Sequence, residues 1–347
     1  MTPSSPDLLD ARCKEPVAPD RVTWLFRRFP PGQHPLRELI LKAGNRPRIH
    51  TPQPTAQGAA SLGPPSAEKL DEAEMVRRIR DLPPLPQALT EALRVVRRDD
   101  LRMASCIQAI EHDAVLAAGV LRLANSPFYG ACGRVSTVGD AVRLLGLRTV
   151  AGVVVAVSMR QMLAQWRGRE GQFQVHWAHA VATATAAREL APTACADPDE
   201  AFLAGLLHDL GRLAMAVFSP GSAGLAQRKA RADDIDVGEA EARILGCRHD
   251  DIGAAVARHW QLPDSIVSAI ALHHAPSPSV EPGSVRLETI VHVADAIAHA
   301  LDLTGDPAEA VPPVDNDAWH SVCPSTDRMQ AVFERVEAGV ALLAPNH

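Results

Sequence analysis

The sequence has few of the residues that build β-sheet cores and disulfide frameworks. Aromatic residues make up 4% of the 347 residues, and a single tyrosine is present. Because β-sandwich cores draw on β-branched and aromatic residues, this scarcity, beside abundant alanine, leucine and arginine, favours helices. The six cysteines are scattered and form no CxxC pair, which argues against a zinc knuckle or a disulfide framework. Reduced thiols in a cytoplasm are therefore expected.

Strong charge, long apolar runs and targeting signals are also missing. The formal net charge is −6, which gives no electrostatic footprint for DNA or RNA. We find no run of about 18 apolar residues, the minimum for a membrane-spanning helix. The first residues, MTPSSPDLLDARCKEP, show no basic-then-apolar signal peptide. These absences predict a cytoplasmic protein without a membrane span.

Residues 1–68 differ in composition from the rest of the chain. They include proline-, glycine- and glutamine-rich stretches such as HTPQPTAQGAASLGPPS. Such a composition buries too little apolar surface to offset the entropy lost on ordering, so we predict a disordered leader. Within it, residues 21–29 (RVTWLFRRF) mix aromatic residues with arginines. This segment could be a short docking element, but we favour a segment that makes no contacts.

The remainder of the chain carries helical periodicity. Apolar residues recur three and four positions apart, as at Leu89, Leu93 and Val96, and no convincing strand pattern or fixed repeat occurs. The prediction is an all-α fold. Its expected parts are the leader (1–68), an N-terminal helical half (69–170), a second helical half (171–302), and a C-terminal loop and helix (303–347).

Polar residues able to bind metal interrupt the apolar helices of the second half. The segment AFLAGLLHDLGRLAMAVF reads as one buried helix that contains His208 and Asp209. Burying such groups is costly unless a partner satisfies them. Imidazole nitrogens and carboxylate oxygens are ligands of divalent transition metals, so one or two Mn²⁺, Fe²⁺ or Zn²⁺ ions are expected. The candidate ligands are His179, His208, Asp209, His249, His273, His274 and Asp295.

A purely structural interpretation of these residues, without metal, stays open. A buried histidine and carboxylate can satisfy each other and join two helices without any metal. Three other histidines, His259, His292 and His299, carry no motif support, and we expect ordinary core or surface residues there. His176 is expected to be a surface neighbour of His179.

The order of His179, then His208-Asp209, then Asp295 resembles the HD superfamily of metal-dependent phosphohydrolases. More closely, the chain resembles the HDOD domain, the HD-related output domain of bacterial signalling proteins, over about residues 82–301. The segments that carry this resemblance are LPPLPQAL, IEHDAVLAAGVLRLANSPFYG, VSTVGDAVRLLGLRTVAGVVVA, FLAGLLHDLGRLAM, EARILGCRHDDIGAAVARHWQLPDSIVSAIALHHAP and ETIVHVADAIAHAL. The dipeptide HD alone would be a weak signal, whereas the order of these motifs is specific.

The resemblance implies an HD-domain-like helical bundle with an N-terminal helical subdomain. It also implies a regulatory protein of signal transduction that acts through a protein partner or by sensing a nucleotide. The alternative is a metal-dependent phosphohydrolase or phosphodiesterase acting on nucleotides or cyclic dinucleotides. In that case two ions would clamp the attacking and leaving oxygens, and Arg212 would steady a phosphate.

The sequence departs from one related family, the HD-GYP phosphodiesterases. The only tyrosine, Tyr129, is followed by Gly130, so the Gly-Tyr-Pro motif is absent. Arg212 stands where the related HDIGK motif has lysine, and Ala275 follows the paired histidines where that family has an acidic residue. The chain is therefore not an HD-GYP protein, and no residue beyond Arg212 is assigned a catalytic role.

Overall fold

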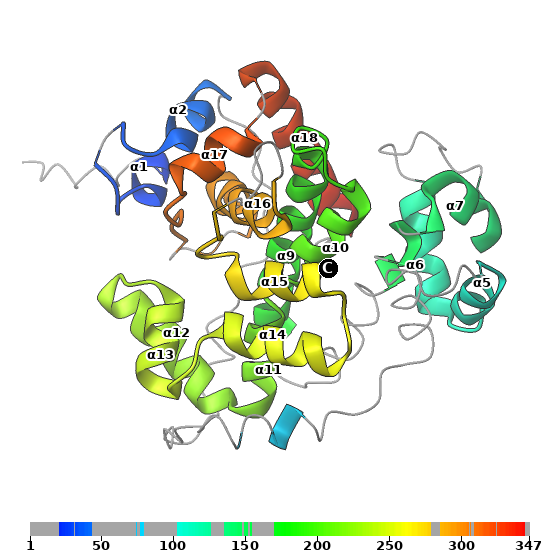
Figure 1. Ribbon diagram of the computed structural model, residues 1–347, viewed down its shortest axis with the longest axis horizontal. Coiled ribbons are helices and arrows are strands. Elements are labelled where there is room, and N and C mark those ends of the chain that lie inside the picture. Colours follow the sequence, from blue (N-terminus) through cyan, green and yellow to red (C-terminus); the bar gives the residue numbers. More distant parts are fainter. Residues whose placement is uncertain are drawn as a thin grey trace, which may run out of the picture.

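The computed structural model describes residues 21–30, 32–43, 74, 77–79, 103–125, 135–147, 149–151, 153–154, 170–278, 285–304, 306, 309–323 and 325–343. Within these residues every regular element is a helix (Figure 1), which confirms the all-α prediction. The proline-rich segment PPLP, residues 126–130 and most of the predicted leader lie outside the described residues. The boundaries of the predicted parts stay a prediction.

The helices are α1 (Arg21–Leu25), α2 (Pro35–Lys42), α5 (Met103–Glu111), α6 (Ala114–Ala124), α7 (Val138–Leu145), α9 (Glu170–Leu190), α10 (Pro198–Leu207), α11 (Leu210–Phe218), α12 (Pro220–Asp233), α13 (Val237–Leu245), α14 (His249–His259), α15 (Asp264–Leu272), α16 (Leu287–Leu301), α17 (Asn316–Val322) and α18 (Thr326–Leu343).

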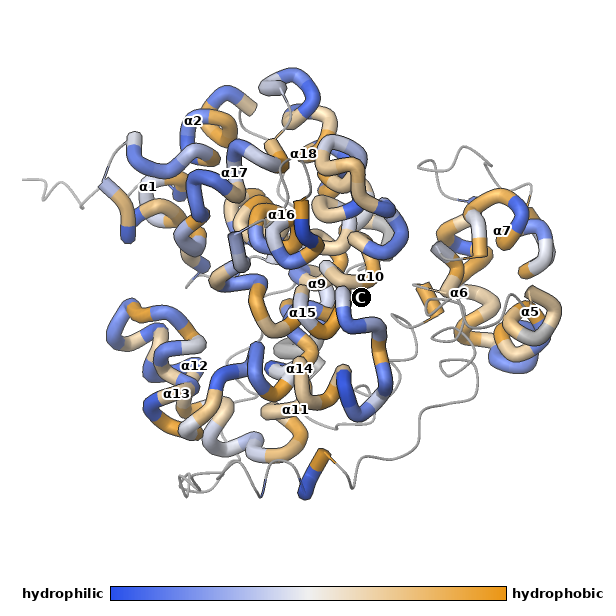
Figure 2. Tube along the Cα trace, in the orientation of Figure 1, coloured by the Kyte–Doolittle hydropathy of each residue, from blue (hydrophilic) through white to orange (hydrophobic). Residues whose placement is uncertain are grey.

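α9 is the central helix of the second half, and it packs against α10, α16 and α18. Its buried face is made of small residues, among them Ala182 and Ala184. A Cβ atom at Gly205 of α10 would lie only 2.8 Å from the Cα atom of Ala184. Small side chains on both helices therefore let α9 and α10 approach closely. Figure 2 shows that hydrophobic residues predominate along α16, which is buried on most of its surface.

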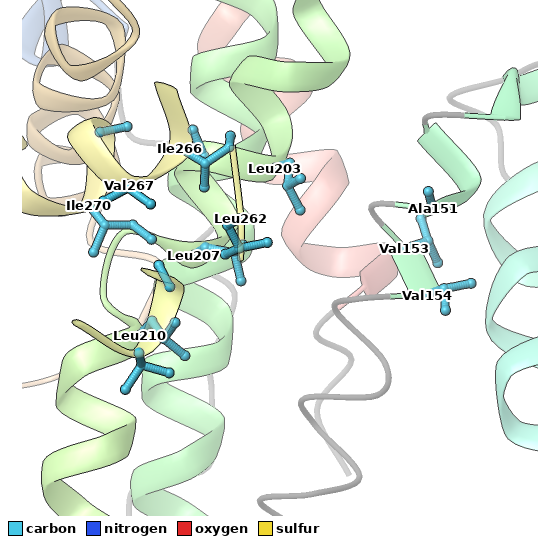
Figure 3. Close-up of a cluster of buried hydrophobic side chains, with 14 of the residues drawn as sticks. Ala151, Val153, Val154, Leu203, Leu207, Leu210, Leu262, Ile266, Val267 and Ile270 are labelled. Atoms are coloured by element: carbon cyan, nitrogen blue, oxygen red, sulfur yellow. The ribbon is translucent and has the colours of Figure 1, made fainter. Parts of the chain in front are cut away.

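The segment expected to be one long helix is two helices. α10 ends at Leu207 and α11 begins at Leu210, so His208 and Asp209 occupy the junction. The prediction of a single helix was wrong, because every residue here tolerates a helix and tertiary packing decides the break. Leu207 and Leu210, on either side of the junction, belong to the same buried cluster as residues of α15 (Figure 3). His208 and Asp209 are therefore held in place by buried leucines on both sides of the junction.

The same stretch, Pro198–Phe218, has the length and composition of a membrane span. Its best window has a mean hydropathy of 1.4, and 72% of that window is buried inside the fold. His208, Asp209 and Arg212 interrupt the stretch, so it is not a continuous apolar run. The burial is what a core helix pair of a globular protein produces.

The N-terminal helices α5, α6 and α7 pack on one another at one side of the molecule (Figure 1), and their buried apolar residues belong to the same cluster as those of α10, α14 and α15. Asp113 caps α6, with Oδ1 accepting from the backbone N–H of Val115 at 2.9 Å. The Asn125 side chain donates to the carbonyl of Val135 at 2.7 Å and accepts from its N–H at 2.9 Å. Asn125 therefore joins the residue that ends α6 to Val135 through two hydrogen bonds.

Part of the predicted leader is folded and docked. α1 and α2 lie against α16 and the following residues, and Leu25, Phe26 and Leu36 are at most 2% exposed. The prediction of a disordered leader is wrong for residues 21–43, and so is the preference for a segment without contacts. The proline-rich composition of the surrounding residues outweighs a few apolar residues in the average. In the folded protein these apolar residues are buried against an apolar surface that only the second half provides.

Candidate metal centre

The seven residues predicted as metal ligands converge on one centre, although they come from five parts of the chain. α9 supplies one, the α10–α11 junction two, the first turn of α14 one, the end of α15 two, and the middle of α16 one. In that order they are His179, His208, Asp209, His249, His273, His274 and Asp295. All except the half-buried His274 are buried. The structure brings the whole set together, and its role in holding metal stays a prediction.

The first ligand group consists of His179, His208 and Asp295. Oδ1 of Asp295 lies 2.9 Å from Nε2 of His179 and 3.5 Å from Nε2 of His208. The two imidazole Nε2 atoms are 3.2 Å apart. Two imidazoles and a carboxylate gathered in this way are a donor set that suits a divalent transition metal.

The second ligand group consists of His249, His273 and His274. Their ligand atoms all lie within 4.8 Å of one another. Nε2 of His249 is 2.8 Å from Nε2 of His274, and the rings of His273 and His274 have centroids 4.0 Å apart. Three imidazoles around one point are a nitrogen-rich donor set, which suits Zn²⁺ or Fe²⁺ better than Mg²⁺ or Ca²⁺.

Asp209 lies between the two groups. Its Oδ2 is 3.6 Å from Nε2 of His208 in the first group, and its Oδ1 is 3.4 Å from Nε2 of His249 in the second. Neither oxygen has a hydrogen-bond partner among the described residues, although both are buried. A buried carboxylate without a hydrogen bond is costly unless a cation neutralises it. Arg212 supplies one such cation, and the position of Asp209 between the two groups also fits a bridging ligand between two ions.

Hydrogen bonds to the outer ring nitrogens orient three of the histidines. Nδ1 of His208 lies 2.7 Å from the carbonyl of Gly205, and Nδ1 of His273 lies 2.8 Å from the carbonyl of Ile270. Nδ1 of His249 lies 2.6 Å from Oε2 of Glu241. These acceptors place a proton on Nδ1 and leave Nε2 with its lone pair directed at the centre, as metal-ligating histidines require. The donor set, the orphaned oxygens and the tautomers all fit metal ions.

Comparison with known proteins decides the family. Residues 82–276, more than half of the chain, match the HDOD domain. The chain belongs to the HDOD family. The resemblance found in the sequence motifs is thereby confirmed, and the HDOD match spans the α10–α11 junction and both histidines that follow α15. α16, α17 and α18 lie beyond the matched region.

Solved structures share this HDOD fold. A protein from Shewanella amazonensis, provisionally named a phosphohydrolase, is 27% identical, with a TM-score of 0.55 and coverage of 76% of this chain and 97% of that one. A provisionally named signal transduction protein from Marinobacter aquaeolei is 22% identical, with a TM-score of 0.62 and coverage of 80% and 67%. The second likeness concerns the fold alone.

A curated relative is much longer than this HDOD chain. An uncharacterized protein of Treponema pallidum is 28% identical over 207 residues, which are 58% of this chain and 39% of that protein. The HDOD chain thus spans about two fifths of the length of the curated relative that it matches.

The electrostatics of the HDOD centre favour anionic carboxylates, whereas the imidazoles differ. Burial lowers the pKa of His179 and of His273, while Asp209 and Asp295 outweigh burial and raise the pKa of His208. Burial opposes a charge on Asp209, but the guanidinium of Arg212 and the nearby histidines outweigh it and hold the pKa of Asp209 well below its usual range. Burial, followed by repulsion from His208 and His249, lowers the pKa of His273 to about 3. Neutral imidazoles and ionised carboxylates are the protonation states that bind metal.

Arg212, the candidate phosphate contact, lies beside the bridging carboxylate. Its Nε is 3.2 Å from Oδ1 of Asp209 without hydrogen-bond geometry. In the described structure the guanidinium therefore offsets the charge of Asp209. Contact between Arg212 and a phosphate stays a prediction.

Two glycines bring α11 and α14 together at the centre. A Cβ atom at Gly211 would lie 1.7 Å from the carbonyl oxygen of His249, and one at Gly253 would lie 2.9 Å from the backbone nitrogen of Gly211. Only glycine permits this crossing, which sets the first turn of α14 directly against the residues that follow Asp209. The glycine of the sequence motif HDLG was an available signal for this close approach of two helices.

His299 and Glu309 were missed. Nε2 of His299 lies 3.4 Å from Oδ1 of Asp295, and Nδ1 lies 2.6 Å from Oε1 of Glu309. The expectation of an ordinary core or surface histidine was wrong for His299. Its spacing of four residues from Asp295 on α16, which places both on one helix face, was an available signal. No sequence signal points to Glu309, because the chain returns to the site through a loop.

The remaining histidines differ in outcome. His292 is a satisfied core residue as expected, with Nδ1 2.6 Å from the carbonyl of His273 and Nε2 accepting from the N–H of Asp315 at 3.1 Å. His176 is half-buried and not a surface residue. Burial, together with the nearby guanidinium of Arg212, lowers the pKa of His176 to about 4.

Proposed function

We propose that this HDOD protein binds two divalent transition-metal ions and acts as a regulatory module of signal transduction. The observation that carries the proposal is Asp209, a buried carboxylate without hydrogen bonds that lies between two groups of ligand atoms. Both groups have donors of the type that Mn²⁺, Fe²⁺ and Zn²⁺ take, and hydrogen bonds to Nδ1 orient His208, His249 and His273 among them. The proposed compartment is a cytoplasm.

Each ion would have its own ligands and share Asp209. His179, His208 and Asp295 would hold the first ion, and the three members of the second ligand group would hold the second. When bound, such ions neutralise the carboxylates and link α9, the α10–α11 junction, α14, α15 and α16 into one rigid arrangement. A protein partner that contacts this arrangement would respond to the metal state. A partner is proposed instead of a nucleotide, because no described feature outside the metal centre points to a nucleotide.

The enclosure of the centre favours binding over turnover. Six of the seven ligands are buried, and only His274 is half-buried. A hydrolase of this type needs an open coordination position and access for a phosphate ester. Burial on this scale supports a centre that holds metal and positions helices.

A phosphohydrolase is the second candidate, and two observations favour it. Two ligand groups that share a carboxylate are the arrangement used for metal-assisted attack on phosphate esters. Arg212 places a guanidinium beside that carboxylate. The Shewanella amazonensis protein that is 27% identical also carries the provisional name of a phosphohydrolase. The substrate class would be nucleotides or cyclic dinucleotides.

Metal analysis combined with a turnover assay tests both candidates. Purified protein would be analysed for metal content as wild type, as Asp209→Ala and as His259→Ala, a matched control at an exposed histidine. Two ions per chain in the wild type and the control, lost in Asp209→Ala, would support the metal centre. Absence of bound metal in the wild type would overturn it.

The same preparations distinguish regulation from catalysis. Cyclic dinucleotides and phosphate monoesters would be incubated with protein loaded with Mn²⁺ or Fe²⁺. Metal binding without turnover supports the regulatory module. Turnover that disappears in Asp209→Ala and persists in His259→Ala would replace it with the phosphohydrolase.

A further inference from the structure

Outside the ligand set, His299 and Glu309 form a pair that touches the first ligand group. His299 lies between two carboxylates, with Nε2 3.4 Å from Asp295 and Nδ1 2.6 Å from Glu309. Its ring also packs on the ring of His179, with centroids 4.4 Å apart. The pair therefore contacts two of the three members of the first group and none that is described in the second.

Glu309 is held in place by residues near it in the chain. Its Oε2 accepts from the hydroxyl of Thr304 at 3.0 Å, and its Oε1 accepts from the backbone N–H of Ala310 at 3.2 Å. The position of Glu309, and with it the orientation of His299, depends on how residues 304–311 are arranged. Carboxylates that hydrogen-bond to a histidine in this way are known to orient metal sites from outside the ligand shell.

The N-terminal segment, residues 21–43, holds the backbone on both sides of Glu309. Arg27 Nη1 donates to the carbonyl of Glu309 at 2.9 Å. The N–H of Val311 donates to the carbonyl of Leu25 at 3.0 Å. Arg21 forms a two-point ion pair with Asp302, at 2.8 and 2.7 Å. These contacts connect α1 to the loop that carries Glu309.

Further contacts along the N-terminal segment strengthen the docking. Arg21 also donates to the carbonyl of Asp306 at 2.7 Å, and His34 Nε2 lies 3.1 Å from the carbonyl of Pro312. Arg27 and Arg28 both pair with Asp234, at the end of α12. The segment and residues 285–343 both lie outside the region that matches the HDOD family. The contact between them is therefore an addition to the HDOD domain.

We propose that the N-terminal segment is an intramolecular clamp that tunes the first ligand group. The docked segment fixes Glu309, Glu309 and His299 position Asp295 and His179, and the first ion binds more tightly as a result. The inference rests on the proposed function, since it assigns a regulatory element to that same centre. The second ligand group, which has its own support in Glu241, does not depend on the clamp.

A double variant tests the clamp by metal titration. Arg21→Ala/Arg27→Ala removes the described contacts of both side chains, and Arg143→Ala removes an exposed ion pair with Asp140 as a matched control. Mn²⁺ binding would be measured by calorimetry. We expect the affinity for one ion to fall by about 5-fold or more in the double variant. The affinity for the other ion, and both affinities in the control, should stay at the wild-type values.

Two variants of Glu309 test the positioning role. Glu309→Ala removes the acceptor for His299, and we expect it to weaken one ion by about 10-fold. Glu309→Gln keeps an acceptor oxygen and should recover part of that loss. Equal effects of Ala and Gln on both ions would contradict a positioning role and indicate general destabilisation.

The wild-type protein offers a test that needs no variant. Because coupling between two sites is reciprocal, metal bound at the centre should stabilise the docked segment. Trypsin cleaves after Arg21, Arg27, Arg28 and Arg37 when the segment is released, so added Mn²⁺ should slow cleavage there. In Asp295→Ala, added Mn²⁺ should no longer change the cleavage rate from the value measured for that same variant without metal.

Hydrogen exchange of metal-free protein separates the clamp from the metal centre. In the Arg21→Ala/Arg27→Ala variant we expect faster exchange in the second half of α16 and unchanged exchange in α14. If the wild type binds no metal, the proposed function fails, and this exchange pattern would still support the positional coupling. If the wild type binds two ions and the double variant, shown to be undocked by trypsin, binds both with unchanged affinity, the clamp is overturned.

Discussion

The two ligand groups differ in where their support comes from. The second group is supported locally: Glu241 holds His249 from eight residues away, and the carbonyl of Ile270 orients His273 from three residues away. In the first group the carbonyl of Gly205 likewise orients His208 from three residues away, but the other two members draw on distant parts of the chain. His179 meets Asp295 across 116 positions of sequence, and the residues that brace Asp295 are braced in turn by α1.

This difference indicates which of the two ligand groups is more open to regulation. A site whose supporting residues all lie within one compact stretch changes only when that stretch unfolds. A site supported by a separate segment responds to docking and release of that segment at little cost to the core. Under the proposed clamp, the first ligand group is therefore the part of the centre that docking of residues 21–43 would influence.

Deleting single ligands should separate the two groups most strongly. His179→Ala removes a member of the first group, and His273→Ala removes a member of the second, whose ligand atom also lies within 4.8 Å of those of His208 and Asp209. Each variant should lose one of the two ions, because the other group keeps its three donors and Asp209. Native mass spectrometry of the Zn²⁺-loaded protein would count the ions. Loss of both ions in either variant would mean that the groups act as a single site.

The crossing of α11 and α14 should be the next most sensitive feature. In Gly211→Ala the new Cβ atom meets the backbone of His249 at 1.7 Å, so α14 must move. We expect a loss of about 3 kcal/mol in the free energy of unfolding, measured by urea denaturation without metal.

Gly221 provides the control for this substitution. A Cβ atom there meets nothing within 4 Å, and alanine in a helix is favoured over glycine by about 1 kcal/mol or less. Gly221→Ala should therefore leave stability unchanged or slightly higher. Wild-type stability in Gly211→Ala would contradict the close approach of the two helices.

Removing the local support of the second group should mirror the effect of removing Glu309. Glu241 contacts Nδ1 of His249 at 2.6 Å and accepts from its backbone N–H at 3.0 Å. In Glu241→Ala we expect a loss of about 10-fold in affinity for the second ion alone, measured by calorimetry with Zn²⁺. In the double variant with Glu309→Ala the two losses should add in free energy. Strong non-additivity would show that the two supports are connected.

The smallest expected effect is a pH dependence of the clamp. Burial lowers the pKa of His34, which accepts from the N–H of Leu36 at 3.3 Å through Nδ1 and packs between the rings of Phe26 and Phe29. Because the folded pKa lies below the ordinary value of about 6.5, docking is at full strength above that value. It weakens as the pH falls from there through the lowered pKa, since the released segment binds the proton more readily.

Hydrogen exchange of residues 21–43, corrected for the intrinsic effect of pH, would measure this change. His34→Gln, which does not titrate, should remove the pH step and keep an acceptor for the cap. A step of the same size in that variant would assign the pH dependence to another group.

Much of the centre was predictable because buried polar residues are costly. His208, Asp209 and Asp295 stand out in apolar helices, and residues of that kind need partners. The residues that support them were not predictable in the same way. Glu309 sits among prolines and acidic residues in a loop, and its contact with His299 exists only because α16 and that loop fold back on each other.

The N-terminal segment shows that composition can also predict disorder where tertiary contacts produce order. Its composition, averaged over residues 1–68, predicts disorder, and three apolar side chains reverse that outcome over residues 21–43. Docking depends on an apolar surface assembled from α9, α16 and α18. No local property of residues 21–43 describes that surface.

The sequence alone determined the helical class, the HDOD family and the set of residues able to bind metal. These follow from periodicity, motif order and the chemistry of single side chains, which are local properties. The tertiary structure alone decided that the helix breaks at His208-Asp209, that Asp209 lies between two groups of ligands, and that α1 reaches the loop of Glu309. These depend on which surfaces meet, and packing between distant segments settles that after the local preferences have been satisfied.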